Sequence, residues 1–262
     1  MSEPTLGPEG IRRFVSQVME MWVLPEVRRR QEAGELPKPF GLRAAQVVFD
    51  PDRQRPVVRL NEEVRALADM RLKHGIQRGV GEPVMLGEIE EIRDMQLCQE
   101  EDKDCGHITL VLQGNHGTIS FDARMNKDLA RRHIAVARDF LETARTCLAQ
   151  RKWAPFADTL FSAAELLAKA TLLSVAAREL RKKETHRRIH TKLNWWARLG
   201  NVDQRFKETF NKLAGLRPGA RYLKSDFSLP EKEAEELLAT VQEMASEAER
   251  SYEQSETSSP TD

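Results

Sequence analysis

Residues 157–175, ADTLFSAAELLAKATLLSV, decide the fold of the C-terminal half of the chain. Small and apolar residues recur here every three or four positions, which is the spacing of one face of an α-helix. Strand-like alternation is absent from the stretch. It therefore predicts an amphipathic helix with one continuous face for packing. That face consists of Ala157, Leu160, Phe161, Ala164, Leu167, Ala168, Thr171, Leu172 and Val175.

The same helical period continues on both sides of this stretch, from about Asn126 onward. Gly200 is suited to end one of the helices, because glycine readily adopts the left-handed conformation found there. Residues 217–222, RPGARY, are expected to interrupt the helical pattern. Connections are mostly short, so neighbouring helices should pack antiparallel. The further stripes occupy residues 134–148, 189–199, 206–216 and 234–248.

The N-terminal part has a different pattern, which predicts a small α+β domain over residues 1–124. Residues 9–24 form an amphipathic helical stripe, and Pro25 is expected to kink it or to begin a second short helix. Two β-hairpins are predicted, from alternating apolar runs that flank turn residues. The predicted hairpin strands are 45–49 with 56–60, and 107–113 with 118–123.

Between these hairpins the pattern is mixed. Asn61 is predicted to cap a helix that carries Val64, Leu67, Ala68 and Leu72. Further along, a strand is expected over 84–97 and a polar loop over 99–106. The expected organisation is thus an α+β domain (1–124), an all-α antiparallel helical bundle (125–252) and a disordered tail (253–262).

Composition predicts a soluble cytoplasmic protein. Hydrophobic residues make up 40% and charged residues 31% of 262 residues, and Lys+Arg and Asp+Glu both number 41. No run of 18 or more apolar residues is present, so no membrane span is expected. The N-terminus lacks the basic and apolar regions of a secretory signal. The chain has three cysteines, Cys98, Cys105 and Cys147. An odd number does not indicate a framework of disulfide bonds, so a reducing compartment is expected.

Four motifs in the helical half occur in a recognisable order. The first helix carries A-x2-F-L-x2-A at Ala137–Ala144, and the second carries FSAAELLAKA at 161–170. His190 precedes Leu193 near the start of the third helix. An Arg221–Tyr222 pair precedes the last long helix. In this order and spacing, residues 126–252 resemble a HEPN domain.

The resemblance implies one of two kinds of domain. In the ribonuclease kind, an R-x4–6-H motif near the last helices supplies charge stabilisation and acid–base chemistry. In the other kind, which is associated with nucleotidyltransferases, an Arg-Tyr pair stands there. No His occurs in residues 223–228, so the non-catalytic, nucleotidyltransferase-associated type is predicted. Its implied partners are a nucleotidyltransferase, or a defence or toxin–antitoxin effector, and a second copy of the chain.

One R-x4-H match does occur, from Arg181 to His186, but it lies between the second and third helices. We interpret it as a chance match. We therefore expect no imidazole in the cleft beside Tyr222. Arg181, His186 and His190 are the only candidates if the protein is a metal-independent endoribonuclease, which is the alternative hypothesis.

The strongest charge signal is the segment 178–198, where eight Lys and Arg face two Glu, a net of 8 − 2 = +6. It predicts contact with the phosphates of RNA or of a nucleotide. The alternative is pairing with residues 231–262, which carry ten acidic and two basic residues. The Arg-Tyr loop adds candidates through the resemblance. The predicted binding residues are Arg178, Lys182, Lys183, Arg187, Arg188, Arg217, Arg221 and Tyr222.

The remaining signals favour structure over chemistry. Adjacent helical residues point about 100° apart, so one of Trp195 and Trp196 is expected in the core and the other at its edge. Packing is expected for both, although base stacking is the alternative. No recognised metal-ligand spacing joins Cys98, Cys105 and the nearby histidines, so no metal and no cofactor is predicted. The sequence thus predicts a non-catalytic module that binds RNA, a nucleotide or a protein. A structural adaptor acting through residues 1–124 is a third hypothesis.

Overall fold

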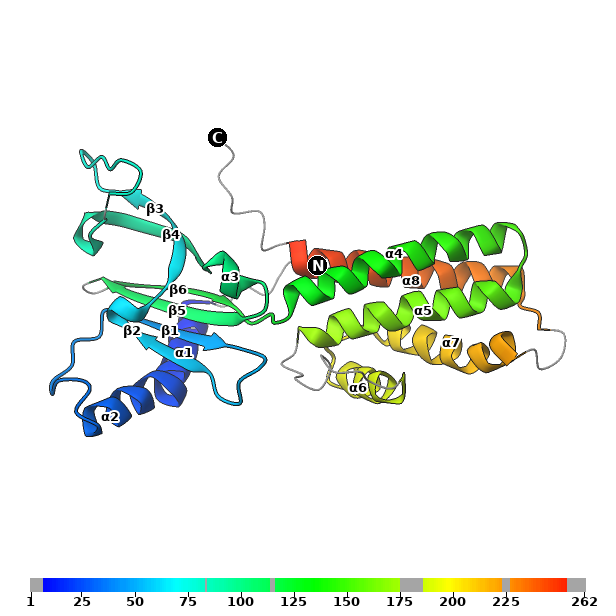
Figure 1. The fold of residues 1–262 in the computed structure, drawn as a ribbon, viewed down its shortest axis with the longest axis horizontal. Helices are drawn as coiled ribbons and strands as arrows, with labels where there is room; N and C mark the ends of the chain where they lie inside the picture. The colour runs from blue at the N-terminus through cyan, green and yellow to red at the C-terminus, as the bar shows by residue number, and fades with distance from the viewer. Residues whose placement is uncertain (1–6, 83, 114–115, 175–185, 223–226, 254–262) are drawn as a thin grey trace. The chain divides into compact units, whose positions relative to one another are not determined.

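The computed structural model consists of two compact units, Met1–Met125 and Asn126–Asp262. Each unit has its own hydrophobic core, and Figure 1 shows sheets and helices in the first unit and helices alone in the second. The expected fold class, an α+β region followed by an all-α bundle, is confirmed. The structure describes residues 7–82, 84–113, 116–174, 186–222 and 227–253.

The first unit begins with a helical segment that changes character along its length. One π-helical turn, η1, joins two α-helices, and Pro25 lies in the first turn of the second. Proline is tolerated there because the backbone N–H groups of a first turn have no partner within the helix. The elements are α1 (Pro8–Val18), η1 (Met19–Val23) and α2 (Leu24–Glu32).

An antiparallel sheet of order β2-β1-β5-β6 follows. Both predicted hairpins form within it, β1 with β2 and β5 with β6. Residues 114–115 of the second predicted turn lie outside the described residues, and His116 and Gly117 already belong to β6. The strands are β1 (Ala44–Phe49), β2 (Val57–Leu60), β5 (Gly106–Gln113) and β6 (His116–Asp122).

The helix predicted after Asn61 is wrong. Asn61–Glu63 forms a single 3-10 turn, η2, and β3 (Ala66–Leu72) then pairs antiparallel with β4 (Ile89–Leu97). Asn61 does not cap a helix, because its side-chain Oδ1 accepts the backbone N–H of Arg43 at 2.7 Å. Strand pairing thus prevails over a weak helical pattern. The predicted strand starts late, after η3 (Leu86–Glu88), and the predicted loop contains α3 (Gln99–Asp102).

The two faces of the sheet differ in chemistry. Val18 and Val23 of the helical segment pack on an apolar face that includes Val47. On the other face, buried Gln46 donates from Nε2 to Thr109 Oγ1 at 3.1 Å. The alternation follows from the pleat, which sends neighbouring side chains to opposite faces.

The second unit is a bundle in which α5 occupies the centre. It packs against α4, α6, α7 and α8, and α4 and α5 run antiparallel (Figure 1). Phe156, Leu160 and Leu167 of α5 are fully buried, and each such side chain contributes roughly 1.5–3 kcal/mol of hydrophobic stabilisation. The helices are α4 (Lys127–Ala149), α5 (Trp153–Leu173), α6 (His186–Arg198), α7 (Gln204–Tyr222) and α8 (Glu231–Glu253).

Residues 217–222 do not interrupt the helical pattern as predicted. They form the last turns of α7, with Pro218 inside the helix. Proline removes one backbone hydrogen bond there, yet its fixed φ is compatible with a helix. Buried Ala220 and the packing of α7 on α5 continue the helix past that defect.

The acidic helix α8 is paired along its length. Ion pairs join it to α4 through Arg138–Glu249 and to α7 through Lys212–Glu233, the latter with 2.6 Å between Nζ and Oε1.

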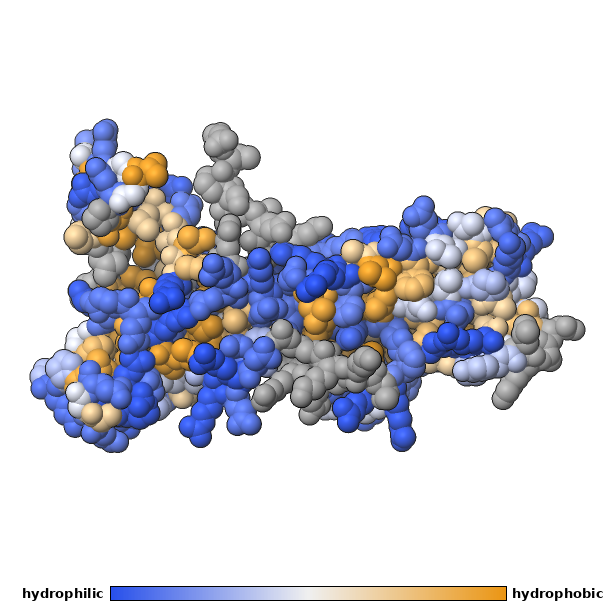
Figure 2. Space-filling view, in the orientation of Figure 1, coloured by the Kyte–Doolittle hydropathy of each residue, from blue (hydrophilic) through white to orange (hydrophobic). Residues whose placement is uncertain are grey.

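The apolar surface along α4 is visible in Figure 2, and Val136 on that helix is 46% exposed. The tail predicted to be disordered lies outside the described residues, except for Glu253, which belongs to α8.

His133 on α4 is a half-buried imidazole in an unfavourable setting. Burial, followed by the charges of Lys169 and Arg132, lowers the pKa of His133 to about 4. Within the described part of the chain, the buried Nε2 atom has no hydrogen-bond partner. The folded bundle therefore holds this side chain in the neutral form.

We expect acid to destabilise the bundle through His133. The unfolded chain accepts a proton near pH 6.5, whereas the folded chain does so only near pH 4. Stability is therefore complete above pH 6.5 and falls as the pH drops from 6.5 towards 4. His133→Leu should remove roughly 1–2 kcal/mol of the loss between pH 7 and pH 5. Urea unfolding at both pH values measures this, and equal losses in the two proteins would contradict it.

A basic pocket between α5, α6 and α7

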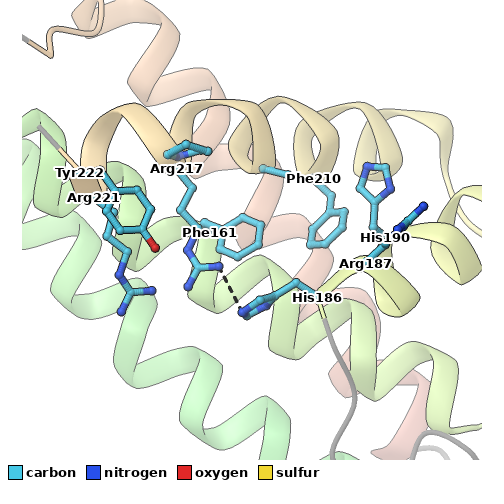
Figure 3. A pocket seen from close by; sticks show the side chains of 10 residues that line it. Phe161, His186, Arg187, His190, Phe210, Arg217, Arg221 and Tyr222 are labelled. Atoms are coloured by element: carbon cyan, nitrogen blue, oxygen red, sulfur yellow. Dashed lines mark hydrogen bonds between the residues drawn. The ribbon is translucent and has the colours of Figure 1, made fainter. Parts of the chain in front are cut away.

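A pocket of about 420 Å³ opens on the surface of the helical unit where α5, α6 and α7 meet. Figure 3 shows His186 of α6 and Arg217 of α7 turned towards each other beside the Phe161 ring, with Arg187 and Arg221 at opposite ends of the view. The inner wall of the pocket is apolar and its rim carries nitrogen atoms. The lining residues are Phe161, His186, Arg187, His190, Phe210, Ala214, Arg217, Pro218, Arg221 and Tyr222.

The helical period explains why these side chains meet. His186 and His190 are four residues apart on α6, and Arg217 and Arg221 are four residues apart on α7. Side chains at this spacing lie one above the other on the same helix face. Because α6 and α7 both pack on α5, the two faces turn towards a common space.

Arg217 is the most constrained basic residue of the pocket, with a side chain only 18% exposed. Its Nε donates to Asp158 Oδ1 at 3.3 Å, and its Nη1 donates to His186 Nε2 at 3.3 Å. Its guanidinium carbon also lies 4.6 Å from the centre of the Phe161 ring, in cation–π contact. These contacts fix the guanidinium in one orientation.

Arg221, Tyr222 and Arg187 form the accessible rim. The side chain of Arg221 is 50% exposed, and its Nη1 is 4.0 Å from Asp158 Oδ1, which is the limit of an ion pair. Tyr222 is 72% exposed, and Arg187 is exposed on the first turn of α6. The cationic groups that a ligand meets first are therefore those of Arg187 and Arg221.

His186 is oriented by a carboxylate. Its Nδ1 contacts Glu165 Oε1, and its Nε2 faces Arg217. A carboxylate at one ring nitrogen selects the tautomer in which that nitrogen carries the proton. Nε2 is then the acceptor for the N–H of Arg217. Nε2 thus lies on the pocket side of the ring, where Arg217 contacts it.

His190 belongs to a second polar network at the other end of the pocket. Asn194 on α6 contacts His190 Nδ1 at 3.2 Å, and its side-chain oxygen accepts from Asn211 Nδ2 at 2.9 Å. The network holds α6 against α7. His190 also lies 5.9 Å from Phe210, measured between ring centres.

The apolar wall rests on two stacked rings. Phe161 of α5 and Phe210 of α7 have centres 5.7 Å apart and an interplanar angle of 23°. Both rings are almost fully buried, so they shape the pocket while leaving little ring face to a ligand.

The expectation that no imidazole shares the cleft with Tyr222 is wrong. His186 and His190 both line the pocket that contains Arg221 and Tyr222. The sequence separation misled the prediction, because His186 lies well before Arg217 along the chain but contacts it across the α6–α7 packing. The Arg181–His186 match therefore brings at least its histidine into the site.

Other predicted residues have mixed outcomes. The structure brings Arg187, Arg217, Arg221 and Tyr222 into one pocket, whereas Arg188 is exposed on α6 and does not line it. Trp196 packs against the core and Trp195 is 54% exposed, so one of the pair is a core residue, as expected, but the packing role expected for Trp195 is not confirmed. The candidates Arg178, Arg181, Lys182 and Lys183 lie outside the described residues.

Sequence analysis missed the contribution of α5. Asp158, Phe161 and Glu165 all contact pocket residues. A signal for them is present, since they fall at positions i, i+3 and i+7 of one helix and so share a face. Asp158 and Glu165 lie at the two ends of this helix face. They flank Phe161, which the apolar pattern alone predicts to be a core residue.

The fold and the pocket define this unit as an all-α domain with a basic, histidine-containing cleft. Residues 130–251 match the family model of the HEPN domain. The second unit of the chain therefore contains a HEPN domain. Comparisons with curated proteins and with solved structures found no match. Within the described residues, every helix is too short or too polar to cross a membrane.

The contacts of Arg217 predict how much its side chain contributes to the free energy of unfolding. Arg217→Met removes the ion pair with Asp158, the bond to His186 and the contact with Phe161, and should cost about 1–2 kcal/mol. Arg221→Met, at an exposed position with one marginal pair, should cost less than about 0.5 kcal/mol. Urea unfolding of the two variants measures the difference, and equal destabilisation would contradict the contrast drawn between the two arginines.

Proposed function

We propose that the HEPN domain is a binding module that takes a phosphate-bearing ligand, RNA or a nucleotide, in the pocket between α5, α6 and α7. The observation that carries the proposal is the pair of exposed guanidinium groups, Arg187 and Arg221, at the rim of an apolar cavity. Guanidinium groups bind phosphate oxygens through two parallel hydrogen bonds.

The exposed ring of Tyr222 supports the same proposal. It lies on the rim next to Arg221 and offers a surface on which a base stacks. Stacking on an aromatic ring contributes roughly 1–3 kcal/mol per base and tolerates different bases. An aromatic ring beside a guanidinium group is typical of sites that bind single-stranded nucleic acids.

The proposal includes regulation through protein partners, as the nucleotidyltransferase-associated type implies. A nucleotidyltransferase, or a defence or toxin–antitoxin effector, is the class of partner we propose. A second copy of the chain is also proposed, and exposed Val136 on α4 supplies apolar surface for it. Sedimentation velocity of the purified chain tests the dimer, and a monomer at micromolar concentration would count against it.

His186 favours a second candidate function, that of a metal-independent endoribonuclease. Its Nδ1 faces Glu165 and its Nε2 points towards the pocket, the arrangement of a general base oriented by a carboxylate. In such a reaction Nε2 would take the proton of a ribose 2′-hydroxyl as that oxygen attacks the adjacent phosphate. A 2′,3′-cyclic phosphate would form as the bond from phosphorus to the 5′-oxygen of the next nucleotide breaks, and that leaving oxygen would take a proton from water. Arg221 would offset the charge that develops on the phosphate oxygens.

The binding proposal predicts loss of affinity when the rim charges are reversed. Arg187→Glu with Arg221→Glu should weaken binding of a fluorescent single-stranded RNA, or of fluorescent ATP, by roughly 10–100-fold at 50 mM salt, because each charged hydrogen bond contributes about 1.5–3 kcal/mol. Fluorescence anisotropy measures it. Arg198→Glu, at the far end of α6, is the matched control and should change affinity less than threefold. Unaltered binding in the double variant would remove the proposal.

The two candidate functions differ in what happens to RNA. A binding module leaves a labelled single-stranded RNA intact during prolonged incubation in EDTA. An endoribonuclease of the proposed kind produces fragments, and His186→Gln should slow cleavage at least 100-fold. Gel analysis of the wild-type and His186→Gln proteins decides between them. Cleavage that His186→Gln leaves unchanged would exclude the role of His186.

A further inference from the structure

Two carboxylates on α5 contact the basic groups of the pocket from behind. Asp158 and Glu165 are seven residues apart on one helix, which is close to two full turns, so both point from the same face. Each contacts a side chain that belongs to a different helix. α5 thus supplies anions to a site whose lining from α6 and α7 is basic.

Asp158 serves two guanidinium groups through one oxygen. Its Oδ1 accepts from Arg217 Nε at 3.3 Å and lies 4.0 Å from Arg221 Nη1. Arg217 is too enclosed to rely on water for charge compensation, so the nearby carboxylate stabilises it. Asp158 at the same time reduces the attraction that Arg221 exerts on an incoming anion.

Glu165 has the corresponding role beside His186. Its carboxylate contacts His186 Nδ1, next to the pocket rim formed by Arg187. The carboxylate of Glu165 lies within the electrostatic reach of the pocket.

Among the described residues of the site, the charges of arginine and carboxylate side chains nearly balance. Arg187, Arg217 and Arg221 supply three positive charges and Asp158 and Glu165 two negative ones, a net of 3 − 2 = +1 when the histidines are left out of the count. A ligand group with one negative charge matches this value. A triphosphate brings several charges and would leave most of them without a partner beside two carboxylates.

We propose that Asp158 and Glu165 determine specificity by ligand charge, so that the pocket favours a group with a single phosphate charge over a polyphosphate. The inference rests on the proposed function and adds the charge class of its ligand. It assigns the two α5 carboxylates the task of offsetting the arginines, in addition to orienting Arg217 and His186. A merely structural role would lower affinity for every phosphate ligand alike.

The test compares two probes on the full chain. One is a ribodinucleotide with a single phosphodiester group and no terminal phosphate, and the other is ATP. Asp158→Asn and Glu165→Gln each remove one negative charge and retain an oxygen that accepts from Arg217 or His186. Isothermal titration at 100 mM salt gives the ratio of ATP affinity to dinucleotide affinity for each variant.

Asp158→Asn should raise this ratio about tenfold, because the additional negative charges of ATP lose a repulsive neighbour. Glu165→Gln should raise it in the same direction. Asp139→Asn, the same charge change at an exposed position on α4, is the control and should leave the ratio within twofold of wild type.

Three results separate the possibilities. A ratio that rises in both α5 variants and not in the control supports the inference. A ratio that stays constant, with both probes weakened or strengthened together, overturns the inference and leaves the proposed function standing. If wild type binds neither probe and no RNA, the proposed function fails and the inference fails with it. Because the two variants are independent, misfolding of one leaves the other to decide.

Discussion

Burial of the Arg217 guanidinium between α5 and α7 is the constraint on which the pocket depends. A charge that is so little exposed requires a counter-ion and donor partners, and Asp158, His186 and the Phe161 ring provide them. These partners come from α5 and α6, so satisfying Arg217 fixes how α6 and α7 lie on α5. The position of the accessible rim, Arg221 and Arg187, then follows from the helical period.

The same arrangement explains how one pocket supports two candidate functions. The exposed guanidinium groups are suited to hold a phosphate, whether or not the bound RNA is then cleaved. Whether chemistry follows depends on the Nε2 atom of His186, which accepts from Arg217. An imidazole engaged in this way is an orienting group for Arg217, and it becomes a base only if a ligand draws Arg217 away.

Sequence periodicity was sufficient to predict the elements that bury a continuous apolar face. The residues of α5, α4 and α8 were predictable because apolar side chains recur at helical spacing around a single core, and the two hairpins because alternation and turn residues coincide. Weak patterns failed where tertiary contacts decide. The stretch after Asn61 pairs with β4 as a strand, and residues 217–222 remain helical despite Pro218 because α7 packs on α5. Four of the ten lining residues followed from charge and resemblance, namely Arg187, Arg217, Arg221 and Tyr222, and His186 and His190 were candidates only under the alternative ribonuclease hypothesis. The contact of His186 with Arg217 could not, because it joins residues far apart in sequence through helix packing.

The most direct test of this account is the protonation state of the His186 ring. Nitrogen-15 NMR of the histidine-labelled full chain at pH 8, with His186→Gln to assign the signals, distinguishes the two tautomers. The account predicts a proton on Nδ1, facing Glu165, and an unprotonated Nε2 that accepts from Arg217, with both signals altered by Glu165→Gln. A proton on Nε2, as a solvent-exposed imidazole prefers, and signals indifferent to Glu165→Gln would contradict it.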